Sequence, residues 1–258
     1  MITLKSEREI EVMQESGRIT AAVLHEIKTA IVPGVSTLEL DRVAENAIRR
    51  RGAVPAFKGY RQFPSSVCIS VNEEVVHGIP NKRKILRVGD IVGLDMGVIW
   101  KGWYSDSAIT VAVGDITSDA QKLLDVTRES LFKGIEKALD GGRVGDIGHA
   151  VQSHVEQFGY SIVRDLVGHG VGRQLHEEPQ VPNFGEAGYG EPLRAGMVIA
   201  IEPMVNMGTK DVAIKRDNWT IVTQDGQLSA HFEHTVAITR NGPVILTLPE
   251  GANIPCTV

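Results

Sequence analysis

The chain is poor in three features that would each place a protein in a special class: cysteine, positive charge and long apolar segments. Two cysteines in 258 residues, Cys68 and Cys256, are too few for a disulfide scaffold, so we expect free thiols in a reducing compartment. The net charge of −5 argues against a basic surface for nucleic acid, so no sequence-specific nucleic-acid binding is expected. No run approaches the roughly 18 apolar residues of a membrane helix.

The remaining composition is that of an ordinary globular protein. Apolar residues make up 42% of the chain and charged residues 23%. The first residues are charged and lack the apolar core of a secretory signal, so we expect a cytoplasmic protein without membrane contact. The length fits one large domain, and no linker divides it, so we expect a single domain over residues 1–258.

Hydrophobic periodicity predicts an α+β fold in which helices precede strands twice. The first helix is expected to end near Gly34, and Ser36 or Thr37 is expected to cap the second. The pattern predicts two similar halves, each pairing helices with a mostly antiparallel sheet. The predicted helices are 6–30, 37–51, 118–139 and 145–158, and the predicted strands lie within 54–114 and at 160–164, 196–202, 212–215, 219–223, 230–239 and 243–247.

Two aspartates interrupt apolar strand segments that flank a Lys101-Gly102 turn. Asp95 lies in "IVGLDMGVI" and Asp106 in "WYSDSAITV", although aspartate is depleted from strand interiors. A two-residue turn places Asp95 opposite Ala108, with Asp106 as its diagonal neighbour on the same face. Like charges so close would repel unless a cation lay between them. The alternative is one acid bonded to backbone amides at a bulge, with the other exposed.

The same anomaly recurs in two later strands. Glu202 ends the apolar run "GMVIAIEPMV", and Glu233 interrupts "SAHFEHTVAIT", where His231 shares its face by the period of two. Each acid alone could be an edge residue whose carboxylate has hydrogen-bond partners. Coincidence is a poor explanation for carboxylates in three separate apolar strand segments. The stretch "VGHGVGRQLHEEP" adds His169, and His176 follows seven residues later.

Four carboxylates and one imidazole form an oxygen-rich donor set with a single nitrogen. Such a set suits Mn²⁺, Fe²⁺, Co²⁺ or Zn²⁺ rather than an ion that prefers thiolate. Four negative charges balance two divalent ions, and a pair of ions about 3.5–4 Å apart is a known hydrolytic arrangement. A water held by such ions can reach a pKa of about 7, which makes it a nucleophile at neutral pH.

The segments "GLDMG", "YSD", "GHGVGRQLHEEP", "IEP" and "HFEHT", in this order, resemble the methionine aminopeptidases of the pita-bread fold. The resemblance extends from about residue 5 to 248, and the ordered set is far more specific than any one segment. The short stretch between Glu202 and Glu233 is similar to type I enzymes and leaves no room for the helical insert of type II.

The resemblance implies a role for each matching residue. Two divalent ions (Co, Mn, Fe, Zn or Ni) would be held by five ligands. His77 would position the scissile bond or protonate the leaving nitrogen, His176 would stabilise the tetrahedral intermediate, and Glu202 would also carry the proton of the attacking water. The implied metal ligands are Asp95, Asp106, His169, Glu202 and Glu233.

An apolar pocket for methionine is the second implication of the resemblance. Phe57 lies near it, and a thioether packs well against aromatic rings. The resemblance also implies a monovalent cation held by backbone oxygens near Asn72, Glu74 and Ser229. The implied pocket residues are Tyr60, Phe63, Cys68 and Trp219, with His77 and His176 facing the substrate.

The function implied is removal of the initiator methionine from nascent proteins whose second residue is small. The expected partner is a peptide or nascent-chain N-terminus, met at the ribosome surface by a monomeric enzyme. One alternative is a proline-directed peptidase of the same fold, which usually carries an extra N-terminal domain. The other is a non-catalytic pita-bread binding module, which tends to lose metal ligands.

Overall fold

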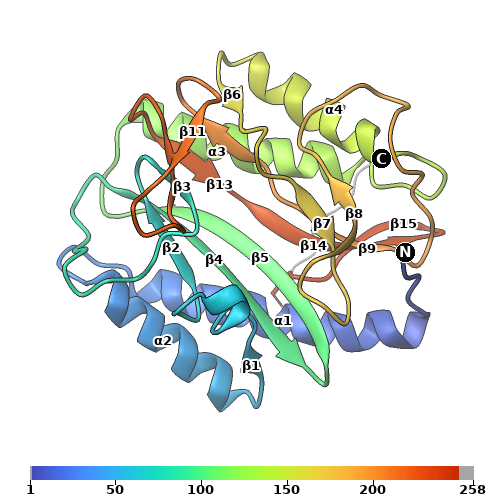
Figure 1. Ribbon diagram of the computed structural model, residues 1–258, viewed down its shortest axis with the longest axis horizontal. Helices are drawn as coiled ribbons and strands as arrows, with labels where there is room; N and C mark the ends of the chain where they lie inside the picture. Colours follow the sequence, from blue (N-terminus) through green and yellow to red (C-terminus); the bar gives the residue numbers. More distant parts are fainter. Residues whose placement is uncertain (1, 250–258) are drawn as a thin grey trace.

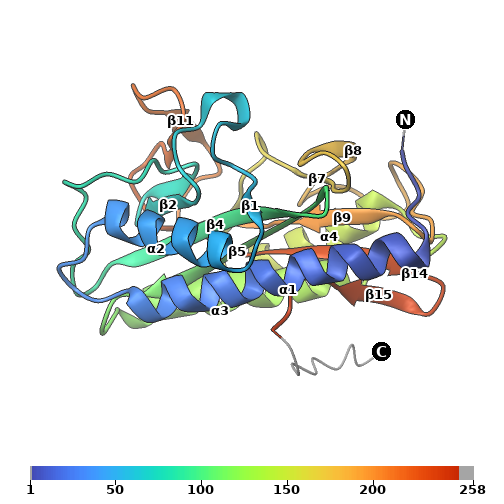
Figure 2. The same cartoon turned by 90° about the horizontal axis from the view of Figure 1, so that it is seen from below.

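A curved nine-stranded sheet, with helices on one side and loops on the other, organises the computed structural model of the protein (Figures 1 and 2). The structure describes residues 2–249, so Cys256 lies outside the described residues. The main path of the sheet runs β1-β4-β5-β14-β9-β7-β8, with β2 paired to β4 and β15 to β14. All of its pairings are antiparallel. Its strands are β1 (Val54–Pro55), β2 (Cys68–Val71), β4 (Ile91–Trp100), β5 (Trp103–Ala112), β7 (Gly168–Gly170), β8 (Glu177–Val181), β9 (Val198–Ile201), β14 (Glu233–Thr239) and β15 (Gly242–Ile245).

Three of the four α-helices among the described residues begin at a capping side chain. Ser6 and Glu9 form a capping box at the start of α1, and Ser36 and Glu39 form another at α2. Thr117 caps α3 through the backbone N–H of Ala120. The helices are α1 (Glu7–Ala30), α2 (Thr37–Arg50), α3 (Ser118–Ile135) and α4 (Val144–Glu156), so the predicted 118–139 helix is four residues too long at its end.

Two apolar cores under the sheet give the fold its two halves. One joins α1 and α2 to β4 through residues such as Ile27, Leu40 and Leu94. The other joins α3 and α4 to β9 and β14 through residues such as Leu123 and Ile199. The prediction of an α+β fold with two helix-covered halves is confirmed.

Two small sheets lie beside the central one. The first contains β6 (Ser161–Ile162), β10 (Met204–Asn206) and β13 (Ser229–His231), and the second contains β3 (Glu74–Val76), β11 (Val212–Ile214) and β12 (Ile221–Thr223). The predicted strand 230–239 therefore breaks at Phe232, where the chain passes from a small sheet into β14. No helix among residues 2–249 is long and apolar enough to cross a membrane.

Candidate metallopeptidase site

Five neighbouring strands each carry one predicted metal ligand to the same region. Their spatial order is β4, β5, β14, β9 and β7. Residues more than a hundred positions apart therefore become neighbours because their strands pair edge to edge. In that order the residues are Asp95, Asp106, Glu233, Glu202, which directly follows β9, and His169.

Strand register sets the acids on one face. Asp95 pairs with Ala108, and Ala108 in turn pairs with Glu233 across β5 and β14. Asp106 pairs with Gly97, two residues beyond Asp95, so the two aspartates are diagonal neighbours. The register predicted from the Lys101-Gly102 turn is confirmed.

Ligand atoms in this cluster lie close enough to share a metal ion. One ligand atom each from Asp106, His169 and Glu233 lies within 4.8 Å of the others. The Nε2 atom of His169 lies 3.5 Å from Oε1 of Glu202 and 4.0 Å from Oδ2 of Asp106. Its Nδ1–H donates to the carbonyl of Gly170 at 2.9 Å, which leaves the Nε2 lone pair directed at the acids.

The carboxylates are buried without protein partners. Oδ1 of Asp95, Oδ1 of Asp106 and Oε1 of Glu233 are buried and accept no hydrogen bond from the described residues. Burial raises the pKa of Asp95 to about 7. Burial and the neighbouring carboxylates raise the pKa values of Asp106, Glu202 and Glu233 well above their usual range. A divalent cation would satisfy these oxygens and cancel their repulsion, so the donor set fits metal ions.

Two further histidines face the cluster as neutral imidazoles. Burial lowers the pKa of His77, and burial with the nearby His169 lowers that of His176 to about 3. The hydroxyl of Tyr60 lies 2.9 Å from Nδ1 of His176, and the two rings stack. With Tyr60 as the donor, His176 keeps its proton on Nε2 and can donate it to a substrate. His77 has a φ of 58°, a left-handed conformation.

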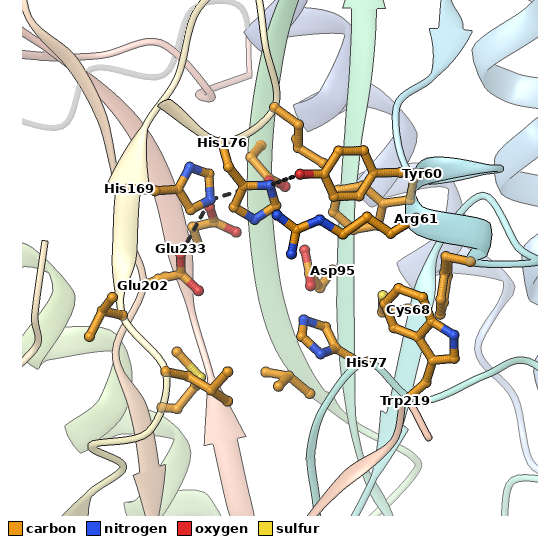
Figure 3. A pocket seen from close by; sticks show the side chains of 18 of the residues that line it. Tyr60, Arg61, Cys68, His77, Asp95, His169, His176, Glu202, Trp219 and Glu233 are labelled. Atoms are coloured by element: carbon orange, nitrogen blue, oxygen red, sulfur yellow. Dashed lines mark hydrogen bonds and ion pairs between the residues drawn. The ribbon is translucent and has the colours of Figure 1, made fainter. Parts of the chain in front are cut away.

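A cavity of about 310 Å³ joins this cluster to an aromatic wall (Figure 3). Phe63 and Trp219 meet edge to face at 5.1 Å between ring centres, and His77 meets Trp219 in the same way at 6.1 Å. The structure brings every predicted site residue to this cavity. They are Tyr60, Phe63, Cys68, His77, Asp95, Asp106, His169, His176, Glu202, Trp219 and Glu233, with Phe57 beside them.

Two residues without a predicted role also belong to the site. Arg61 lines the cavity and extends its side chain toward His176 (Figure 3). His231 is buried, and its unpartnered Nε2 lies 3.8 Å from Oε2 of Glu202. The two-residue spacing between His231 and Glu233 could have indicated that His231 belongs to the site. Nothing in the local sequence around Arg61 indicates where its side chain points.

The predicted monovalent-cation region is compact. The carbonyl of Asn72 accepts the N–H of Ser229 at 3.0 Å. The carboxylate of Glu74 is buried and forms ion pairs with Lys84 and Lys215. The backbone cation site stays a prediction.

Comparison with known proteins assigns the chain to a class. The model of metallopeptidase family M24 matches residues 11–240, and the chain belongs to that family. It is 53% identical to the methionine aminopeptidase of Clostridium acetobutylicum over 250 residues, which cover 97% of this chain and 100% of the relative. It is also similar to the crystal structure of the methionine aminopeptidase of Thermotoga maritima, with a TM-score of 0.94, 47% identity and coverage of 96% of this chain and 99% of that one.

The fold extends to a second kind of peptidase. The prolidase of Pyrococcus horikoshii matches with a TM-score of 0.78 and 25% identity. The match covers 96% of this chain but 65% of the prolidase. The likeness to methionine aminopeptidases is therefore closer in identity, in backbone and in length.

Proposed function

We propose that the protein is a type I methionine aminopeptidase, which removes the initiator methionine from nascent proteins whose second residue is small. The observation that carries the proposal is the cavity in which a buried carboxylate cluster faces an apolar wall of Phe63, Cys68 and Trp219. An unbranched thioether packs against such a wall, with its first peptide bond toward the acids. Near-complete alignment with relatives named methionine aminopeptidase supports the same substrate.

In this proposal Asp95, Asp106, His169, Glu202 and Glu233 hold two divalent ions drawn from Mn, Fe, Co, Zn or Ni. Bound ions would supply Lewis acidity, which polarises the scissile carbonyl and activates water. The three unpartnered carboxylate oxygens support this assignment. The identity of the ions depends on cellular supply as well as on the donor set.

The remaining groups position the peptide and move protons. His176 donates Nε2–H to the oxygen that gains charge in the transition state, because Tyr60 fixes its tautomer. His77 positions the scissile bond or, once it has received a proton from Glu202, passes that proton to the leaving nitrogen. Glu202 takes the proton of the attacking water and passes it on toward the leaving nitrogen.

The proposal also covers the setting of the reaction. The substrate would be a peptide or the N-terminus of a nascent chain, met near the ribosome surface in the cytosol by a monomeric enzyme. A backbone-held monovalent cation near Asn72 and Ser229 is part of the same proposal.

Peptide turnover tests the proposal against its main alternative. The metal-loaded enzyme should hydrolyse Met-Gly-Met rapidly and Met-Lys-Met slowly, because the second residue must be small. Ala-Pro and Leu-Pro peptides should be poor substrates. Faster cleavage of the Xaa-Pro peptides would replace the proposal with a proline-directed peptidase, and no cleavage of either set would favour the binding-module alternative.

A further inference from the structure

A second cavity, of about 700 Å³, adjoins the candidate site and shares part of its wall. Arg61, Val167, His169 and His176 line both cavities. If the first residue of a peptide occupies the aromatic pocket, the chain beyond the scissile bond has to leave past this shared wall. From here on we call the second cavity the downstream groove; it is also lined by Thr3, Lys5, Trp103, Gly168, Arg173, Gln174, Glu177, Glu178 and Gln180.

We infer that the downstream groove holds the substrate from its third residue onward, and that Arg61 selects peptides with an acidic side chain at that residue. The inference rests on the proposed aminopeptidase function, which it deepens by assigning a substrate preference. The preferred substrate class is a peptide of the form Met, small residue, acidic residue.

The backbone directs Arg61 toward the junction of the two cavities. Arg61 has a φ of 45° and Gln62 a φ of 75°, so two consecutive side-chain-bearing residues adopt left-handed conformations. Each such conformation costs on the order of 1 kcal/mol for a residue with a Cβ. Hydrogen bonds close the turn, from the N–H of Phe63 to the carbonyl of Tyr60 at 2.8 Å and from that of Gly59 to the carbonyl of Phe63 at 2.8 Å. The turn therefore holds the arginine at the mouth of the site (Figure 3).

The charge of Arg61 is unengaged within the part of the chain that the structure describes. Its guanidinium makes no ion pair or hydrogen bond there, and its carbon lies 5.4 Å from the centre of the Tyr60 ring. Its closeness to the reaction site is also evident electrostatically. Burial lowers the pKa of His176 most, the nearby His169 contributes the next largest decrease, and the charge of Arg61 contributes the third.

The other cations of the downstream groove already have partners. Lys5 forms an ion pair with Glu177 at 2.8 Å. Arg173 stacks on the Trp103 ring at 3.8 Å from its centre and donates to the carbonyl of Gly102 at 3.4 Å. Arg61 is therefore the cation of the downstream groove whose hydrogen-bond donors are free to bind a substrate carboxylate.

Chain geometry points to the third residue of the peptide. A small second residue carries no charged group. Successive residues of an extended chain advance by about 3.3–3.6 Å, so the Cα of the third residue lies about 5 Å beyond the scissile bond, within reach of a long side chain anchored at the junction. A planar guanidinium binds a carboxylate through two parallel hydrogen bonds, and it repels an ammonium group.

Competition among matched peptides tests the inference. We would measure kcat/KM for Met-Gly-Glu-Met, Met-Gly-Gln-Met and Met-Gly-Lys-Met, all as C-terminal amides so that no terminal carboxylate occupies Arg61. At low ionic strength the wild-type enzyme should cleave the Glu peptide fastest, the Gln peptide next and the Lys peptide slowest. We expect the ratio of kcat/KM for the Glu and Lys peptides to be about tenfold. This ratio should shrink in 0.5 M salt, because salt screens exposed charges.

Three variants separate a contact from an effect of net charge. Arg61→Gln should bring the Glu-to-Lys ratio close to one, and Arg61→Lys should retain part of it because the charge stays but the two-pronged geometry is lost. Arg128→Gln removes the same charge from an exposed side chain on α3, paired with Asp125, and should keep the wild-type ratio. A shift in the ratio for Arg128→Gln equal to that for Arg61→Gln would contradict the inference.

The two proposals fail in different ways. If the wild-type enzyme cleaves all three peptides with no Glu-to-Lys preference, or if Arg61→Gln keeps the preference, the inference is wrong and the aminopeptidase function stands. If none of the three peptides is cleaved, the function itself fails and the inference fails with it.

Discussion

Asp41 and Glu74 are buried as deeply as Asp106 and Glu233, with at most 6% of each residue exposed, yet protein atoms satisfy only the first pair. Asp41 accepts the N–H groups of Ser66 at 2.8 Å and Val67 at 3.2 Å. Glu74 pairs with two lysines and also accepts a backbone N–H.

The difference between these regions separates structural from functional carboxylates. A buried ion that finds protein donors fixes two chain segments to each other, as Asp41 does for α2 and the loop before β2. A buried ion left without donors destabilises the metal-free fold unless a group from outside supplies the missing charge. The acids of the metallopeptidase site belong to the second kind.

Asp106→Asn should have the largest effect. The change keeps the shape and removes one charge, so at least one metal ion should be lost, together with several kcal/mol of transition-state stabilisation, on the order of 10³-fold in kcat/KM. The metal-free variant should melt at a higher temperature than metal-free wild type, because a buried repulsion is gone. Elemental analysis, peptide turnover and thermal unfolding measure the three quantities, and wild-type metal content would refute the assignment.

His231→Leu should have the next largest effect. Nε2 of His231 faces Oε2 of Glu202 at 3.8 Å, and removing a side chain that supports a metal ligand typically weakens metal affinity by about 10–100-fold. His231→Gln restores a donor and should recover most of the affinity. Titration calorimetry with Mn²⁺ compares the two, and equal affinities for the Leu and Gln variants would show that the imidazole serves packing alone.

Asp41→Ala should destabilise the fold and leave metal binding unchanged, which is the opposite of the effect expected for Asp106→Asn. Two buried N–H groups lose their acceptor, so the free energy of unfolding should fall by about 1–3 kcal/mol. Metal stoichiometry should stay at the wild-type value, since Asp41 makes no contact with the metal ligands. Denaturant unfolding and metal analysis check both statements; a stable Asp41→Ala variant that had lost metal would erase the distinction between the two regions.

The pH dependence of metal-free stability gives the smallest effect. Above pH 7.5 the unfolded chain has ionised carboxylates and nearly neutral histidines, whereas folding holds protons on the acids of raised pKa, Asp106, Glu202 and Glu233. The folded state then binds more protons, so its stability falls as pH rises from 7.5 to 8.5, by about 1.4 kcal/mol over this interval for a net difference of one proton. Saturating Mn²⁺ should abolish the slope in thermal unfolding. A metal-free protein whose stability rose over this interval would contradict the raised pKa values.

Local patterns in the sequence predicted the cap of α2, the β4–β5 turn and its register, because each depends on a few neighbouring residues. They did not predict β7, β8 or β10. The first is rich in glycine, β8 contains charged residues and a proline, and all three become strands only through partners distant in the chain. The buried acids stood out as exceptions to the apolar pattern, and the resemblance gave each one a role.

Other parts of the site depend on tertiary structure. The direction of Arg61 follows from a turn with two left-handed residues, which no spacing of apolar residues encodes. The contact between His231 and Glu202 joins β13 to the end of β9, two segments that belong to different sheets. Such contacts become visible only once the sheets are assembled.

Metal titration of chelator-treated protein tests the central claim most directly. Calorimetry with Mn²⁺ at pH 7.5 should show two ions bound per chain, with protons released to the buffer as the carboxylates of raised pKa ionise. A folded protein that binds no Mn²⁺, or that binds it without releasing protons, would contradict the account.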